Sequence, residues 1–184
     1  MPARQGLGAA CLVTIMLTGP AWAAGLEQTG TIPVPGQALT NFDISFIDQS
    51  TGQYYLADRS NAAIDIFDTK TDRYAGRAGR FAGVRVHGGK VDQHKSGPDG
   101  VVVIGHELWA GDGDSSVKII DLATQKTVAT IATGGTTRVD EMAADPKDHV
   151  FIGVNSAEDP PFATLIAVRR VRIFPDIATV CNAA

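Results

Sequence analysis

The sequence contains little cysteine, and the little that it has cannot form a disulfide in the expected mature chain. Its two cysteines are Cys11 and Cys181, and Cys11 lies in a segment that we expect to be removed on export. One thiol would then remain, which excludes an intramolecular disulfide. No cysteine pair is left that could hold a metal ion.

Clusters of basic residues are also missing. The chain of 184 residues has 16 Lys and Arg against 20 Asp and Glu, which gives a formal net charge of −4, and its basic residues are scattered. Nucleic acids and anionic membrane surfaces attract proteins through concentrated positive charge. We therefore expect no nucleic-acid partner. The ligand is a protein or small molecule that the sequence does not identify.

The apolar stretch Leu7–Leu17 is too short to cross a membrane, because a spanning helix needs roughly 20 apolar residues. Arg4 precedes it and Ala21-Trp22-Ala23 follows it. A positive start, a short apolar run and a small-residue cleavage site are the three parts of a secretory signal peptide. We expect Met1–Ala23 to be removed and the mature protein, without a membrane span, to be periplasmic or secreted.

Common catalytic motifs are absent. The sequence has no Gly-x-Ser-x-Gly elbow, phosphate loop or dinucleotide fingerprint, and His106-Glu107 lacks the second histidine of a zinc-protease helix. Asp112-Gly113-Asp114 opens like a calcium loop, but the glutamate that an EF-hand requires downstream is missing, so we expect a hairpin turn. His87 and His94 match no metal-binding spacing.

What the sequence does contain is an internal repeat. Glu107–Ile131 has three short apolar runs separated by polar turns, which predicts an antiparallel meander. When this segment is aligned, without a gap, with the sequence 53 residues earlier (110 − 57), similar residues coincide. The coinciding pairs are Ala57 with Ala110, Asp68 with Asp121, and Thr71 with Thr124. Repeats of this length are typical of stacked four-stranded units.

Three units follow from this repeat, at about residues 41–77, 97–133 and 138–174. The third repeats the first at an offset of 97 (140 − 43), and its last strand is expected at Arg169–Phe174. Ala167 occupies the position of Asp68 and Asp121, and residues 175–184 form an irregular tail. Phe81–Ser96 is expected to be a surface loop inserted between the first two units.

Gly30–Leu39 is expected to form an edge strand ahead of the first unit. Pro33 and Pro35 alternate in it, and a proline cannot donate a hydrogen bond inside a sheet. In a closed ring of such units, a strand of this kind completes the last unit. Residues 24–174 therefore form the folded part of the expected mature chain.

The repeats resemble the YVTN-type β-propellers that bacteria secrete. The resemblance covers about Thr31–Phe174 and rests on Tyr54–Asp68, Gly105–Ile131 and Arg138–Asn155. It implies an all-β fold, a partial β-propeller of about three four-stranded antiparallel blades. Propellers of this type have six to eight blades, so we expect either a truncated member or several copies that assemble and self-associate through open blade edges.

Asp43, Asp99 and Asp140 each stand at the start of the first strand of a unit, with Glu141 beside the third. In a propeller this strand lines the central channel, so these carboxylates are expected to converge. Together they are candidate ligand or metal residues, and the cofactor is unknown, with Ca²⁺ as one option. Secreted gluconolactonase-like propellers use channel carboxylates with a metal. The alternative is that each aspartate caps a turn, the role expected of Asp68 and Asp121.

Two classes of function follow. The first is a secreted or periplasmic binding or scaffold protein of undetermined ligand. Within this class, the chain could also be a truncated product that has no function. The second is a metal-assisted hydrolase or oxidoreductase that uses the channel carboxylates. The blade pattern indicates a fold and not an activity, and the absence of catalytic motifs favours the first class.

Overall fold

The computed structural model describes residues 27–168, and the chain divides into two units, Met1–Thr31 and Ile32–Ala184. Residues 27–31 of the first unit form no regular element, and every strand below belongs to the second. The predicted signal peptide, the predicted strand at Arg169–Phe174 and the predicted tail lie outside the described residues. Within residues 27–168, no helix is long and apolar enough to cross a membrane.

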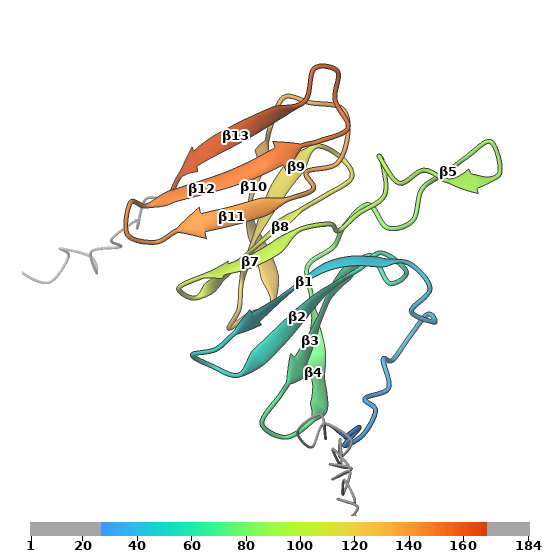
Figure 1. Cartoon of the computed structure of the whole chain (residues 1–184), viewed down its shortest axis with the longest axis vertical. Coiled ribbons are helices and arrows are strands. Elements are labelled where there is room, and N and C mark those ends of the chain that lie inside the picture. Colours follow the sequence, from blue (N-terminus) through green and yellow to red (C-terminus); the bar gives the residue numbers. More distant parts are fainter. Residues whose placement is uncertain (1–26, 169–184) are drawn as a thin grey trace, which may run out of the picture. The chain divides into compact units, whose positions relative to one another are not determined.

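Up to residue 168, the second unit is built from three successive antiparallel meanders (Figure 1). Each is called a blade below, and each runs from its first strand outward in chain order. Blade 1 holds β1 (Phe42–Asp48), β2 (Gln53–Asp58), β3 (Ala63–Asp68) and β4 (Arg73–Ala78). Blade 2 holds β7 (Val101–Ile104), β8 (Glu107–Gly111), β9 (Ser116–Asp121) and β10 (Lys126–Ala132). Blade 3 holds β11 (Met142–Asp145), β12 (Val150–Asn155) and β13 (Phe162–Ala167).

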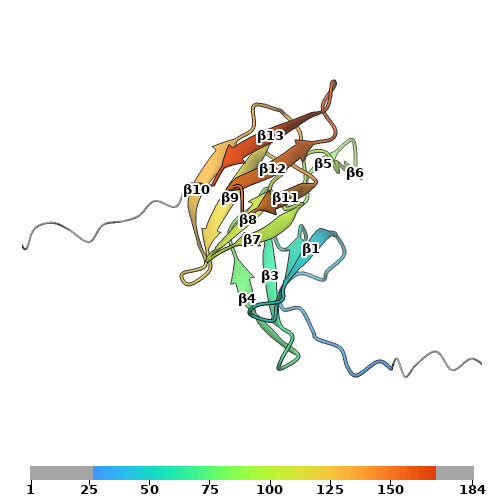
Figure 2. The same cartoon turned by 60° about the vertical axis from the view of Figure 1, so that its left-hand side comes forward.

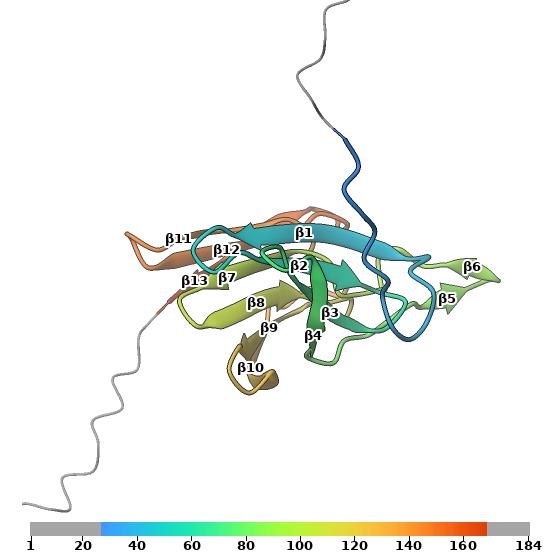
Figure 3. The ribbon, with the colours of Figure 1, turned by 90° about the horizontal axis from the view of Figure 1, so that it is seen from below.

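The first strands of the blades lie side by side, because β7 contacts both β1 and β11 (Figures 2 and 3). The predicted surface loop between blades 1 and 2 carries a short hairpin of β5 (Val86–His87) and β6 (Lys90–Val91). All four residues of this hairpin are exposed, and it projects from the sheets (Figures 1 and 3). The hairpin itself was not predicted.

Aspartate side chains accept hydrogen bonds from backbone amides in the turns between strands. Asp68 Oδ1 accepts a hydrogen bond of 2.8 Å from the backbone of Lys70, and Asp121 Oδ1 accepts one of 2.8 Å from the backbone of Thr124. These backbone and side-chain donors hold the pKa of both carboxyl groups below its ordinary value. The Asx turns predicted for Asp68 and Asp121 are confirmed.

The core consists of apolar layers between neighbouring blades. Tyr55 and Ile64 of blade 1 pack with Leu108 of blade 2, and all three side chains are almost fully buried. Between blades 2 and 3, Trp109 packs on Phe151 with ring centroids 5.0 Å apart. Each blade therefore buries a face on its neighbour, and this burial supplies most of the driving force for stacking.

The gapless alignment of the first two units is correct for β3 and β9 but wrong by one residue for β2 and β8. Ala57 lies opposite Ile64, whereas Gly111, not Ala110, lies opposite the equivalent Val117. The hairpin between β8 and β9 is one residue shorter than that between β2 and β3. Since side chains alternate between the faces of a strand, this slip exchanges the two faces of β8 relative to the alignment.

The predicted edge strand at Gly30–Leu39 is wrong: these residues form no strand. Prolines at alternate positions remove the donors that a ladder would need. The segment is attached instead through side chains. Asn61 exchanges two hydrogen bonds with the backbone of Gln37, and Arg77 donates one of 2.8 Å to the carbonyl of Pro35.

A fully buried polar residue lies at the end of the second strand of each described blade, or directly after it, and holds the segment leading into that blade. These residues are Asp58, Asp112 and Asn155. Asp112 accepts a hydrogen bond of 2.9 Å from the backbone of Ala82, and Asn155 donates one of 2.9 Å to the carbonyl of Thr137. Asp58 accepts a hydrogen bond from the backbone of Asn61, and the Asn61 side chain in turn binds the backbone of Gln37.

Candidate functional site: a charged cluster where the three blades begin

The three aspartates at the blade starts come together. Asp43 lies in β1, Asp99 precedes β7 and Asp140 precedes β11, and one carboxylate oxygen of each lies within 4.8 Å of the other two. The repeat predicted this convergence, because the same rim position recurs in each blade.

The backbone brings these residues into contact at fixed positions. Asp99 N donates to Gly111 O at 3.0 Å and Asp140 N donates to Val154 O at 2.8 Å, so each acid is attached to the second strand of its own blade. Gly100 leaves no room for a Cβ beside the carbonyl of Asp140. A glycine is therefore needed at this position for blades 2 and 3 to approach so closely.

Arg59, which follows β2, is the link between blades 1 and 2. Its Nη2 forms ion pairs with Asp43 and Asp99, and its Nε donates to the carbonyl of Pro98 at 3.3 Å. The Arg59 side chain is only 4% exposed and that of Asp99 is fully buried. One guanidinium thus joins two carboxylates that would otherwise repel one another.

Arg138 plays the same part between blades 2 and 3. Its Nη2 lies 2.7 Å from Asp140 Oδ2 and its Nε lies 3.3 Å from Asp99 Oδ1. Ser156 Oγ donates a further hydrogen bond of 2.9 Å to Asp140. Burial would raise the pKa of Asp140, but the bonds from Arg138 and Ser156 outweigh it and hold that pKa below its ordinary value.

Asp99 is in a different electrostatic position. Burial raises the pKa of Asp99 to about 8, and nearby Asp43 adds to the increase, while Arg59 and Arg138 oppose it. Its Oδ2 is buried and has no hydrogen-bond partner among residues 27–168. The central acid of the cluster therefore takes up a proton more readily than an ordinary aspartate.

This arrangement corrects two expectations. The turn-capping interpretation of Asp43, Asp99 and Asp140 is wrong, since their carboxylates bind arginines and a serine and not turn amides. Glu141 is exposed and does not belong to the group of acids whose oxygens converge. A divalent cation at this point would have to compete with the guanidinium of Arg59, which already contacts two of the three acids.

The inserted segment between blades 1 and 2 covers the cluster. Gln93 binds both arginines: its side-chain oxygen accepts from Arg59 Nη1 and its carbonyl accepts from Arg138 Nη1. The backbone of Arg138 also donates to the carbonyl of His94 at 2.8 Å. The conformation of the insertion is therefore coupled to the charged cluster.

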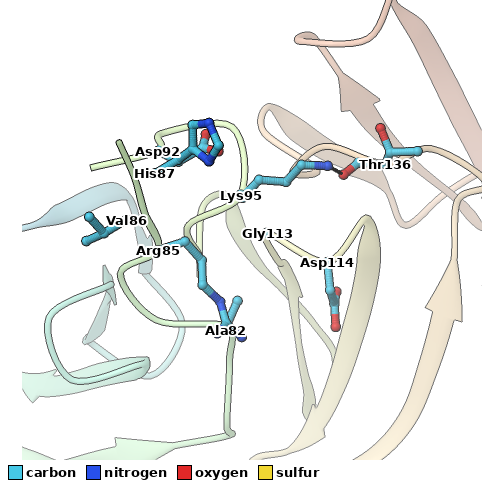
Figure 4. Close-up of a pocket in the computed structure, with 9 residues that line it drawn as sticks. All are labelled: Ala82, Arg85, Val86, His87, Asp92, Lys95, Gly113, Asp114 and Thr136. Atoms are coloured by element: carbon cyan, nitrogen blue, oxygen red, sulfur yellow. Dashed lines mark hydrogen bonds between the residues drawn. The ribbon is translucent and has the colours of Figure 1, made fainter. Parts of the chain in front are cut away.

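Beside the cluster, the insertion forms an open pocket of about 370 Å³ (Figure 4). Lys95 crosses it and donates to the carbonyl of Thr136, at the start of the segment leading into blade 3. Charges of both signs line the pocket together with one imidazole. The charged and imidazole side chains are Arg85, His87, Asp92, Lys95 and Asp114.

Sequence reasoning missed the two arginines. A signal was present, because Arg138 stands two residues before Asp140 and Arg59 directly follows the end of β2. Three converging carboxylates require a cation or a basic partner. A search for arginines close to the first or second predicted strand of each unit would have found both.

Comparison with known proteins gives similarity at the level of fold. No family model matches the sequence, and no curated protein matches it. The structure is similar to that of U3-55K, with a TM-score of 0.50 and 15% identity over 65% of this chain and 34% of that chain. It is also similar to hydrazine synthase of Kuenenia stuttgartiensis, with a TM-score of 0.46 and 14% identity over 70% of this chain and 32% of that one.

The chain thus spans about a third of the length of each of these two proteins. At such low identity the likeness establishes the fold and nothing about activity. Together with the antiparallel meanders and the absence of any helix in residues 27–168, it confirms the predicted fold class. The protein is an all-β chain that forms a partial β-propeller.

Proposed function

We propose that this protein is a binding or scaffold module and not an enzyme. One observation carries the proposal: the recurring acids at the blade starts form ion pairs with Arg59 and Arg138. These ion pairs connect neighbouring blades. A catalytic carboxylate or metal ligand must be open to substrate or ion. The fold, which serves binding in many unrelated proteins, agrees with this assignment.

The ligand contacts the pocket formed by the insertion. Its lining offers separate positive and negative groups, with Arg85 and Lys95 set against Asp92 and Asp114. Such a surface suits a polar partner that carries both signs of charge, such as an exposed loop of another protein. Loops held on a rigid sheet scaffold are the usual place for such contacts.

The compartment proposed for this binding is the periplasm or the extracellular medium. The Arg4, Leu7–Leu17 and Ala21-Trp22-Ala23 pattern supports export. The resemblance to secreted YVTN-type propellers, carried by Tyr54–Asp68 and Gly105–Ile131, supports the same placement.

Metal-assisted hydrolysis or oxidation is the second candidate, favoured by the convergence of Asp43, Asp99 and Asp140 within 4.8 Å. Their oxygens are of the kind that Ca²⁺ and Mg²⁺ prefer. For this function, Arg59 would have to move away from Asp43 and Asp99 when the ion binds. The binding role needs no such rearrangement.

Photo-crosslinking in the producing cells tests the binding role. A benzophenone side chain is placed at Val86, which is 65% exposed in the insertion, or at Val128, which is 58% exposed on β10. We expect one discrete adduct from position 86 and none from position 128. The adduct should disappear when Arg85 and Lys95 are both replaced by alanine, while the melting temperature stays the same.

Equal labelling from both positions, or an adduct that survives the double replacement, would count against the pocket as the binding surface. The metal-dependent alternative is tested separately by calorimetric titration, described in the Discussion. The two experiments use different residues, so one can fail without the other.

A further inference from the structure

Two rows of apolar side chains at the ends of the blade stack lack the cover that equivalent rows have inside it. A row here means residues paired across neighbouring strands, which share one face of the sheet. In blade 2, the row Val103, Leu108 and Ile120 packs on blade 1. In blade 3, the row Ala144, Phe151 and Ile166 packs on blade 2.

The same row in blade 1 is Ile47, Tyr54, Phe67 and Tyr74, which we call the leading row. Among the described residues, no blade precedes it. Ile47 is 48% exposed, and Tyr54 is half-buried where its counterparts Leu108 and Phe151 are fully buried. Phe67, between the two tyrosine rings, is 8% exposed. The three rings form a continuous strip, with centroids 5.7 Å and 5.6 Å apart.

The opposite faces show the same pattern. Tyr55 and Ile66 of blade 1 pack on blade 2, and Trp109 and Ile119 of blade 2 pack on blade 3. The equivalent row of blade 3 is Ala143, Ile152 and Leu165, which we call the trailing row. Leu165 is 71% exposed.

We propose that the trailing row of one copy of this chain binds the leading row of a second copy. Both interfaces inside the chain already join a row of the trailing kind to a row of the leading kind, so the contact between copies would continue an arrangement that the molecule contains twice. Both rows are also uncharged, so their contact would bury apolar surface without removing a charge from water. This inference does not depend on the proposed ligand pocket.

The contact is head-to-tail, because the two rows differ. Such a heterologous interface leaves one row open at each end of a dimer, so copies add until a ring closes. The occupant is a second copy, because rows of the trailing and leading kinds from this same chain already pack on each other at both contacts between its blades.

Light scattering after size exclusion, over a range of concentrations of the exported chain, tests the proposal. The wild-type chain should form assemblies whose mass increases with concentration. Leu165→Glu and Ile47→Glu should each be monomeric. An equimolar mixture of these two variants should form dimers and nothing larger, because one variant retains the leading row and the other the trailing row.

Val128→Glu is the matched control, since Val128 is 58% exposed on β10 and lies in neither row. It should assemble as the wild type does, and all three variants should melt cooperatively near the wild-type temperature. A wild-type chain that stays monomeric at every concentration overturns the proposal. So does a mixture of the two glutamate variants that remains monomeric, or a single variant that still dimerises, which would indicate a symmetric contact.

Discussion

Arg59 and Asp99 form a buried ion pair between the first two blades: the arginine follows β2, the aspartate precedes β7, and their side chains are 4% and 0% exposed. The same guanidinium binds Asp43, so the pair also fixes β1 beside β7. Charges removed from water are costly unless they are paired. The contact between blades 1 and 2 therefore depends on this arginine as well as on the apolar layer.

Above about pH 8, where Asp99 is ionised, replacing Arg59 by alanine should lower the free energy of unfolding by about 3–5 kcal/mol, because it leaves two carboxylates without their partner. Urea unfolding followed by tryptophan fluorescence measures this. Arg73→Ala, on the exposed end of β4, is the matched control and should change stability by no more than about 0.5 kcal/mol. Equal losses in both variants would show that the Arg59 pair does not hold the blades.

Asp99 should make stability depend on pH in a defined direction. Its pKa in the folded state, about 8, lies above the ordinary value of 3.8, so the folded state binds the proton more tightly than the unfolded state. This contribution is complete below about pH 4 and is lost as the pH rises towards about 8. The wild type should therefore lose stability over this range relative to Asp99→Asn, which cannot titrate.

The measurement is the difference in unfolding free energy between these two proteins at several pH values within that window. Asp140 titrates with the opposite sign, because its pKa is lowered, but it is present in both proteins and cancels. A difference that stays constant, or that grows in favour of the wild type with rising pH, would contradict the raised pKa of Asp99.

Removing the arginine should uncover a cation site. We expect weak Ca²⁺ and Mg²⁺ binding by the wild type, because Arg59 contacts two of the three acids. Arg59→Gln should bind Ca²⁺ at least roughly tenfold more tightly, since the oxygens within 4.8 Å then lack that cation. Adding Asp140→Asn should abolish the gain. Calorimetry measures all three, and tight wild-type binding that Asp140→Asn abolishes would favour the metal-assisted alternative.

Asn155 should be the residue that attaches blade 3. Its amide donates to Ser115 Oγ, Thr137 O and Arg138 O at 2.9, 2.9 and 3.3 Å, and it is fully buried. Asn155→Ala should cost about 1–3 kcal/mol, since buried acceptors lose their donor. Urea unfolding of this variant beside the partly exposed Asn41→Ala tests it, and similar midpoints would argue against the role.

Export should produce a chain that starts at Ala24. Removal of Met1–Ala23 leaves 161 residues (184 − 23). Intact-mass measurement of protein recovered from the periplasm or medium decides this, with Ala21→Arg and Ala23→Arg as variants that should accumulate uncleaved. A recovered product that still begins at Met1 would refute the signal-peptide prediction.

The sequence by itself determined most strands of the three blades and the turns between them. Alternating apolar residues and the recurring aspartates at Asp68 and Asp121 are local signals, and the turns they predict depend on a few neighbouring backbone groups. The recurrence of Asp43, Asp99 and Asp140 also placed them at one rim. The sequence alone could predict these features because each depends on residues close together in the chain or on a position that recurs in every described blade.

Only the tertiary structure decided what the rim acids do and which way β8 faces. Arg59 contacts Asp99 across 40 residues of sequence, and no local pattern encodes such a pairing. The faces of β8 are exchanged relative to the gapless alignment because its hairpin to β9 has one residue fewer than the hairpin between β2 and β3. The exposure of Leu165 at the end of the stack likewise follows from what packs beside a sheet, a property of three-dimensional contacts and not of the residue itself.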